Sequence, residues 1–111
     1  MTDRISLLGM RFEGRHGVLP AEKRGPQPFE VDLVLHADLA EAAATDDLAA
    51  TADYGPLFDL ARDIVERRSF DLIEALAGAI ARAALDATDP ARVEAVEVRV
   101  RKPKAPLGGA F

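Results

Sequence analysis

The fold class is decided by a single stretch, Phe29-Glu30-Val31-Asp32-Leu33-Val34-Leu35-His36-Ala37-Asp38-Leu39. Every second residue from Phe29 to Ala37 is apolar, and the residues between them are polar or charged, with the exception of Val34. This alternation is typical of a strand that buries one face and exposes the other. The stretch therefore predicts a long, half-buried antiparallel strand.

Two further strands are predicted, one before and one after this stretch. Residues 5–12 alternate in the same way, and Leu8-Gly9 interrupts the alternation, which indicates a bulge or a bend. A third strand is expected to begin at Val93, and Pro103 stops its alternation of valines with charged residues. Residues 14–28 contain several glycines and prolines and are expected to form a long loop.

Two amphipathic helices are predicted between the second and third strands. The first opens at Gly55-Pro56, because proline suits the first turn of a helix. The second begins at Asp71 and ends before Asp89-Pro90. Their apolar stripes consist of Leu57, Leu60, Ala61, Ile64 and Val65 in the first helix and of Leu76, Ile80, Ala84 and Leu85 in the second. Residues 39–54 are expected to be irregular, with about one helical turn.

The order of these elements, β-β-α-α-β, predicts an α+β fold in which an antiparallel sheet carries two helices packed on one face. Residues 1–111 are expected to form a single domain, since no repeat or linker divides them. Three strands leave an open edge beside the last one, and such an edge accepts a strand from the same chain or from a neighbour. We therefore expect a final strand to be missing after Phe111.

The composition argues against several classes of function. The chain has no cysteine, which excludes disulfides and thiolate metal sites, and it has only two histidines. His16 is expected to be structural and His36 exposed, so no metal site is predicted. The net charge of −5 argues against nucleic acid as a partner. No segment has the length and apolar character of a membrane span or a secretion signal, and we expect a soluble cytoplasmic protein.

Lys102 is the strongest candidate for acid/base chemistry. Strict alternation places it on the same face as Val98 and Val100, which is expected to be apolar. The chain contains eleven arginines and three lysines. Arginine does not release a proton near neutral pH, whereas a desolvated lysine does. The alternative is a solvated lysine at the end of a strand.

Three further residues each have a structural and a functional interpretation. Asp71 and Glu74 have the spacing of a capping box, which explains Glu74 without a ligand. The alternative for Glu74 is a carboxylate that accepts paired N–H donors from a guanidine-like ligand. Glu22 is either a solvated loop residue or a functional carboxylate. Tyr54 either packs on the following helix or directs its hydroxyl group into a cleft.

Taken in order, the motifs of this chain resemble the dihydroneopterin aldolase family of folate biosynthesis. They are Gly14-Arg15-His16-Gly17-Val18, Glu22, Gln27-Pro28-Phe29-Glu30-Val31-Asp32, Asp38-Leu39-Ala40-Glu41-Ala42, Thr45-Asp46-Asp47-Leu48, Asp53-Tyr54, Leu72-Ile73-Glu74-Ala75-Leu76 and Val100-Arg101-Lys102-Pro103 with Ala105-Pro106. The likeness covers essentially the whole chain. It departs from the family at Pro26, where a glycine is common, and in the strand that the family carries beyond the Lys-Pro segment.

The resemblance implies a tunnelling fold, in which the sheets of several subunits join into one barrel. It implies a homo-oligomer, either a tetramer or an octamer, with its sites at subunit interfaces. The implied partner is a small-molecule pterin substrate.

The resemblance also implies a retro-aldol reaction that converts 7,8-dihydroneopterin into 6-hydroxymethyl-7,8-dihydropterin and glycolaldehyde. Epimerisation at C2′ is a common companion activity. The dihydropterin itself stores the electrons of the broken bond, so neither a metal, a lysine Schiff base nor a cofactor is expected. The alternatives are a dihydroneopterin triphosphate 2′-epimerase and a non-catalytic pterin-binding or assembly domain.

The resemblance assigns a role to each candidate residue. Lys102 is the expected general acid/base. Tyr54 is also expected to be catalytic, since it should bond to the side-chain hydroxyl groups of the substrate and help to deprotonate or reprotonate them. Glu74 is expected to bind the 2-amino group and N3–H of the pterin, with the backbone of Ile73 beside it. Glu22 is expected to reach across from a neighbouring subunit and to orient Lys102 or the hydroxyl tail.

Overall fold

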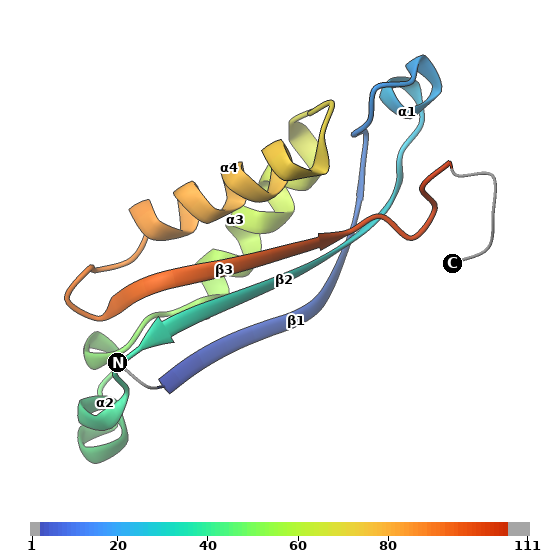
Figure 1. Cartoon of the computed structure of the whole chain (residues 1–111). Coiled ribbons are helices and arrows are strands. Elements are labelled where there is room, and N and C mark those ends of the chain that lie inside the picture. The colour runs from blue at the N-terminus through green and yellow to red at the C-terminus, as the bar shows by residue number, and fades with distance from the viewer. Residues whose placement is uncertain (1–2, 107–111) are drawn as a thin grey trace.

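The computed structural model describes residues 3–106, in which three antiparallel strands form one sheet (Figure 1). The strands are β1 (Asp3–Gly14), β2 (Gln27–Ala37) and β3 (Val93–Arg101), in the spatial order β1-β2-β3. The alternating stretch forms a long antiparallel strand, as predicted, although the strand ends at Ala37 and not at Leu39. The structure places it at the centre of the sheet. Both β1 and β3 are edges of the sheet that the described residues form.

The alternation of β2 translates directly into burial. Its inward side chains are at most 1 % exposed: Phe29, Val31, Leu33, Leu35 and Ala37. The intervening residues of the strand are only partly buried. Because these five side chains supply one continuous apolar face, they form the sheet side of the hydrophobic core.

The interruption predicted in the first strand is a β-bulge. The register between β1 and β2 shifts between Leu7 and Met10. Gly9 has a φ of 67°, a conformation that glycine adopts at little cost. Its N–H donates a hydrogen bond of 2.8 Å to Asp32 Oδ1, so the bulge is tied to the central strand.

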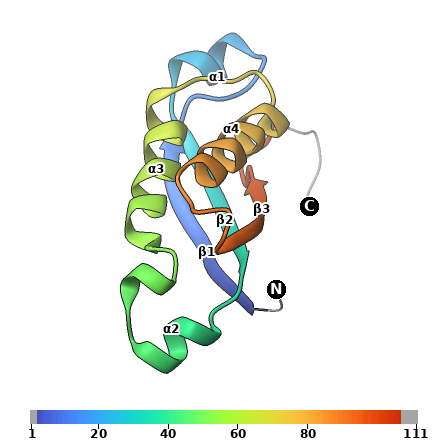
Figure 2. The same ribbon diagram turned by 90° about the vertical axis from the view of Figure 1, so that its left-hand side faces the viewer.

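Two long helices, α3 (Tyr54–Arg67) and α4 (Ile73–Asp86), cover one face of the sheet (Figure 2). Helix α3 packs on β1 and α4 packs on β3. The predicted apolar stripes are confirmed, except that Leu60 is partly buried and Leu85 is 44 % exposed. Leu85 directly follows the buried Ala84, and adjacent helical positions point about 100° apart.

Short helices occupy the segments that the sequence predicts as loop or irregular structure. They are α1 (Pro20–Arg24), α2 (Ala40–Thr45) and a 3₁₀ turn (Leu48–Ala50). Elements of this length are too short to produce a helical period in the sequence. The long helix α3 begins one residue earlier than predicted, because Asp53 acts as its N-cap and accepts a bond from the N–H of Gly55.

Arg101 anchors the end of β3 on the sheet face opposite the helices. Its guanidinium donates hydrogen bonds to both carboxylate oxygens of Asp32, at 2.7 and 2.9 Å, and to Glu30 at 3.1 Å. The bonds from Arg101, followed by the bond from the N–H of Gly9, lower the pKa of Asp32 to about 2. This network fixes the strand immediately before Lys102.

Replacing this carboxylate is expected to weaken the fold in a pH-dependent way. Asp32→Asn should lower the free energy of unfolding at pH 7 by about 1–2 kcal/mol, allowing for partial solvent screening. Because the folded pKa lies below the unfolded value of 3.8, the contribution is complete above that value and is lost as the pH falls toward 2. Urea unfolding at a series of pH values should show the difference from the wild type shrinking in that window. Asp59→Asn, which removes an exposed pair with Arg62, is the control and should change little.

Part of the sequence-based description falls outside the structure. The final strand expected beyond the Lys102-Pro103 segment lies outside residues 3–106. The expectation that His36 is exposed is wrong. The residue is partly buried, because it lies on the central strand and its Nε2 is 3.0 Å from Glu97 Oε1 on β3. Across residues 3–106 no helix combines the length and the apolar character needed to cross a bilayer.

Candidate functional site

The centre of the candidate site is an ion pair between Lys102, directly after β3, and Glu22 of helix α1. Only 14 % of the Lys102 side chain and 9 % of the Glu22 side chain are exposed. The carboxylate also accepts bonds from the N–H of Leu19 at 3.3 Å and from Gln27 Nε2 at 3.2 Å. The hydrogen bond from Lys102 is the main reason why the pKa of Glu22 is lowered, so this carboxylate is an anion at neutral pH.

This pair decides between two of the sequence interpretations. Lys102 is not a solvated lysine at a strand end, because its side chain is largely enclosed. Glu22 is not a solvated loop residue, since it is buried and lies on a short helix. The expectation that Glu22 reaches Lys102 from a neighbouring subunit is wrong: both residues belong to one chain, and α1 brings them together.

Gly17 leaves the space that the Glu22 carboxylate occupies. A Cβ at this position would lie 2.2 Å from Glu22 Oε1, and the φ of 145° is unfavourable for any other residue. Gly9 also has a positive φ, but a Cβ there would meet no atom within 4 Å. The two glycines thus differ in their surroundings while sharing an unfavourable φ.

Gly17→Ala is therefore expected to damage the site, whereas Gly9→Ala is expected to cost only backbone strain of about 1 kcal/mol. The new methyl group would push Glu22 away from Lys102, Leu19 and Gln27 together. We expect the activity that this ion pair supports to fall at least about tenfold in Gly17→Ala, for the loss of about one charge-assisted bond. Steady-state kinetics on both variants, after circular dichroism has confirmed folding, provides the measurement. Equal activities in the two would contradict this account of Gly17.

Ile73 and Glu74 form the first turn of α4, at the same end of the molecule as the ion pair (Figure 1). The predicted capping box is wrong, because Leu72 is the N-cap and no side chain caps the helix. Asp71 instead lies 2.7 Å from the Nζ of Lys23 on α1. Glu74 is exposed and has no role in capping its helix.

Helix α1 and the start of α4 are held together by several contacts. Besides its pair with Asp71, Lys23 Nζ lies 3.3 Å from Ser69 Oγ. The N–H of Gly17 donates a bond of 2.9 Å to the carbonyl of Phe70. The segment that carries Glu22 and the segment that leads into Glu74 are therefore neighbours.

Tyr54 lies at the opposite end of the molecule. It is the first residue of the 14-residue helix α3, whose last residue leads into the loop before α4. The axis of such a helix is about 20 Å long. Tyr54 is 59 % exposed and borders an apolar hollow of about 400 Å³, whose lining includes Ile5, Leu39 and Leu48. One chain alone does not bring Tyr54 to Lys102.

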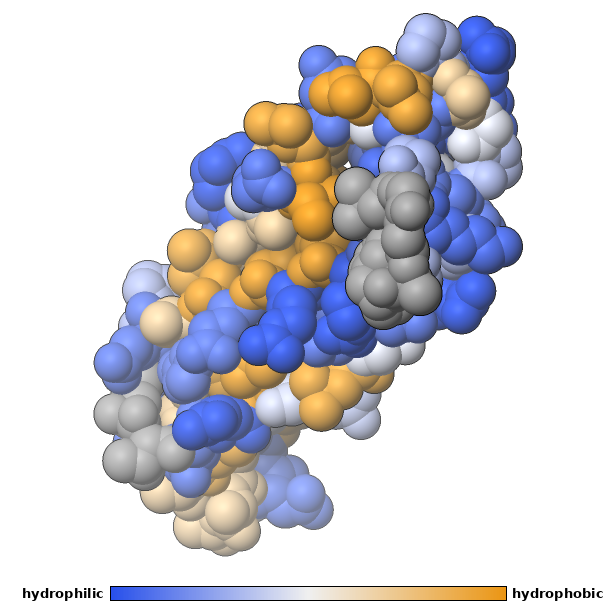
Figure 3. All heavy atoms as spheres, turned by 45° about the vertical axis from the view of Figure 1, so that its right-hand side comes forward, coloured by the Kyte–Doolittle hydropathy of each residue, from blue (hydrophilic) through white to orange (hydrophobic). Residues whose placement is uncertain are grey.

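Apolar side chains surround the end of the molecule that carries the ion pair. Figure 3 shows them as a broken band that extends from the region of α1 along α4 and β3, beside charged side chains. Val18, Leu19 and Leu72 are 66 %, 45 % and 53 % exposed, respectively. Exposed apolar residues grouped in this way are typical of a surface that binds a ligand or another chain.

Comparisons with known proteins show the family of this chain. Residues 5–111 match the family described as dihydroneopterin aldolase. A relative from Methylorubrum extorquens, named dihydroneopterin aldolase, is 48 % identical over 107 residues, which are 96 % of this chain and 81 % of the relative. The chain belongs to the dihydroneopterin aldolase family.

Solved structures of the family share the fold. The dihydroneopterin aldolase of E. coli, solved in complex with neopterin, superposes with a TM-score of 0.88 at 24 % identity, covering 98 % of this chain and 92 % of that one. The enzyme from Burkholderia thailendensis, solved bound to guanine, gives a TM-score of 0.72 at 30 % identity, covering 94 % and 80 %. The α+β fold with an antiparallel sheet and helices is therefore that of the dihydroneopterin aldolases.

Gln27 also contacts Glu22 in this site, although the sequence analysis assigned it no role. It bonds to Glu22 and stands at the first residue of β2. Its place in a quoted family motif, at the end of the loop that carries Glu22, is the signal that could have revealed it.

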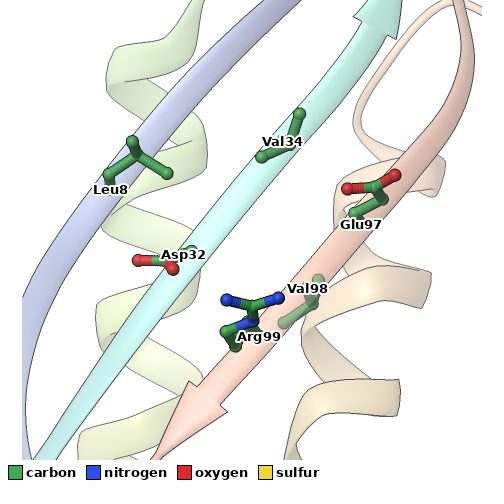
Figure 4. Close-up of a pocket in the computed structure, with 6 residues that line it drawn as sticks. All are labelled: Leu8, Asp32, Val34, Glu97, Val98 and Arg99. Atoms are coloured by element: carbon green, nitrogen blue, oxygen red, sulfur yellow. The ribbon is translucent and has the colours of Figure 1, made fainter.

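A second hollow lies on the sheet face that the helices leave uncovered, and none of the predicted site residues lines it. Its volume is about 280 Å³. As Figure 4 shows, it is lined by Leu8, Asp32, Val34, Glu97, Val98 and Arg99 from the three strands.

Within residues 3–106, no three histidine, aspartate or glutamate side chains are grouped so that they could hold a metal ion.

Proposed function

We propose that this chain is a dihydroneopterin aldolase of folate biosynthesis. It cleaves 7,8-dihydroneopterin into 6-hydroxymethyl-7,8-dihydropterin and glycolaldehyde, and it also epimerises C2′. The observation that carries this proposal is the enclosed Lys102–Glu22 pair beside the start of α4, in a chain that belongs to the family.

The reaction breaks the C1′–C2′ bond of the substrate. Loss of the 2′-hydroxyl proton turns C2′ into the aldehyde carbon of glycolaldehyde. The two electrons of the broken bond move to C1′ and into the C6=N5 imine of the dihydropterin, which becomes an enamine. A proton delivered to C1′ restores the imine and completes the hydroxymethyl group. Since the ring itself accepts the electrons, no step requires a Schiff base on lysine.

Lys102 is the general acid/base of this scheme, acting directly or through a water. Its ammonium donates the proton that C1′ requires. The amine that results is reprotonated by the proton that left the 2′-hydroxyl group, which Tyr54 and a water help to carry. Glu22 orients Lys102 and the hydroxyl tail of the substrate. The enclosure of the pair supports this assignment, because acid/base groups work best where water is excluded and geometry is maintained.

Glu74 binds the pterin ring. Its carboxylate accepts paired hydrogen bonds from the 2-amino group and N3–H, and the backbone of Ile73 lies beside the ring. The exposure of Glu74 and the absence of a capping role support this assignment. The guanine bound by the Burkholderia relative offers the same arrangement of an amino group next to a ring N–H.

Tyr54 enters the site from a second subunit of a homo-oligomer. The distance along α3 separates it from Lys102 within one chain, whereas the apolar hollow beside it is open to a neighbour. Val96, Val98 and Val100 of β3 are only partly buried, and β3 is an edge of the sheet that residues 3–106 form, which supports strand pairing between chains. We propose a tetramer or an octamer in which sheets join into a barrel of the tunnelling fold, each subunit contributing residues 1–111 as one domain.

Incubation of the purified protein with 7,8-dihydroneopterin tests the proposal. Glycolaldehyde and the C2′ epimer should both form. Metal independence stays a prediction, and it requires that a chelator does not reduce the rate. Preferred turnover of the triphosphate would identify a 2′-epimerase instead. Neopterin binding without any product would identify a non-catalytic pterin-binding domain. The cytoplasmic location also stays a prediction.

A further inference from the structure

His16 is a fully buried, titratable residue for which the proposed reaction has no use. Its ring is 0 % exposed and lies between Phe29 of β2, with an edge contact at 5.0 Å, and Phe70, with a stacked contact at 5.9 Å. An imidazole in such a place is costly to bury unless both nitrogens have partners. Its bonding therefore indicates what the residue does.

Both ring nitrogens are bonded to backbone groups of distant segments. Nε2 lies 2.8 Å from the carbonyl oxygen of Val65, in the last turns of α3, and the N–H of Phe70 donates to Nδ1 at 3.1 Å. A carbonyl only accepts and an N–H only donates, so the ring is the neutral tautomer with its proton on Nε2. The positions of these partners hold the ring in one orientation.

The adjacent residue completes a two-point clamp on Phe70. His16 accepts from the N–H of Phe70, and Gly17 donates to its carbonyl at 2.9 Å. Phe70 stands four residues before Glu74, and Gly17 stands five residues before Glu22. The clamp thus joins the two segments that carry the carboxylates of the proposed site.

We propose that His16 is a positioning residue for pterin binding, which sets the separation between Glu22 and the Ile73-Glu74 turn by clamping Phe70. The proposal rests on the proposed function, because the ligand it positions is the pterin. His16 does not touch the substrate and takes no part in proton transfer.

The charges around the ring favour its neutral form. Burial is the main cause that lowers the pKa of His16, and Lys23 of α1 and Lys102 after β3 add to it. These two cations pair with Asp71 and Glu22, respectively. The ring neighbours from β2 and α3 are uncharged, and the guanidinium of Arg68 lies over the Phe70 ring at 4.8 Å.

Two variants separate the positioning role from simple core packing. The side-chain oxygen of His16→Asn can occupy the place of Nδ1 and accept from Phe70, whereas the longer side chain of His16→Gln reaches the Nε2 position toward Val65. We expect His16→Gln to weaken neopterin binding and to raise KM about tenfold or more, the size expected for loss of one buried contact. His16→Asn should keep the neopterin affinity and KM within about threefold of the wild type, although it loses the bond to the carbonyl of Val65. His36→Gln, on the opposite face of the sheet, is the control and should match the wild type.

Binding titration with neopterin, steady-state kinetics and unfolding midpoints distinguish the outcomes. Variants that are less stable but bind neopterin and turn over substrate with wild-type constants would overturn the proposal. If the variants fail to fold, hydrogen exchange on the wild type decides: neopterin should protect the amides of Gly17 and Phe70 more than that of Ala61, and equal protection would overturn it. A wild type that binds neopterin without cleaving substrate would refute only the proposed function. The neopterin affinity of the His16 variants relative to the wild type would still test the role of His16.

Discussion

Lys102→Ala is expected to reduce the turnover of 7,8-dihydroneopterin by about a thousandfold, within the range that a positioned acid/base group supplies. Neopterin binding should change by less than about threefold, because our proposal assigns the ring to Glu74 and the Ile73 backbone rather than to the amine. The two effects are separable by measuring the rate constant of substrate cleavage in single-turnover experiments and the Kd of neopterin by titration. A loss of binding as large as the loss of rate would reduce Lys102 to a binding residue.

Lys102→Arg is the sharper variant. Arginine can keep the ion pair with Glu22, yet it does not release a proton near neutral pH. The variant should therefore fold and bind neopterin as the wild type does, but be almost as inactive as Lys102→Ala. Substantial activity in Lys102→Arg would show that the charge at this position, and not proton transfer, matters. Lys104→Ala removes an exposed lysine two residues away and should leave kcat unchanged.

Mixed oligomers of two inactive variants are expected to recover activity. In the proposed oligomer each site takes Lys102 from one subunit and Tyr54 from another. Lys102→Ala and Tyr54→Phe would each inactivate every site of a pure variant. In a mixed oligomer, a site can combine the intact Lys102 of one variant with the intact Tyr54 of the other. In a statistical one-to-one mixture, roughly a quarter of the sites would be complete. Unfolding the two variants together and refolding them should therefore give about a quarter of the wild-type rate, a large gain over either variant alone.

This experiment tests the position of Tyr54 directly. Two differently tagged preparations of Lys102→Ala, mixed and refolded in the same way, are the control and should stay inactive. Native mass spectrometry establishes that mixed oligomers have formed. If they have formed and no activity returns, Tyr54 does not complete the site of a neighbouring subunit.

Periodicity predicted the long elements because each of them is long enough to show its period. The alternation of residues 29–37 repeats often enough to specify one buried face, and the stripe of α3 repeats over several turns. The five-residue α1 has no room for a period, although Glu22 accepts a bond from the N–H of Leu19 at its N-terminus. The capping box failed for a related reason: a side chain that can cap a helix can equally pair with Lys23, and the tertiary contact prevailed.

The sequence by itself determined the antiparallel sheet, the helices on one face, the family and the identity of Lys102 as the amine to test. These follow from patterns in which every residue depends mainly on its near neighbours in the chain. Only the tertiary structure decided that Glu22 and Lys102 pair within one subunit, that His16 clamps Phe70, and that Tyr54 lies a helix length away. Such contacts join residues 54 to 80 positions apart, and no local pattern encodes which distant groups will meet once the core has closed.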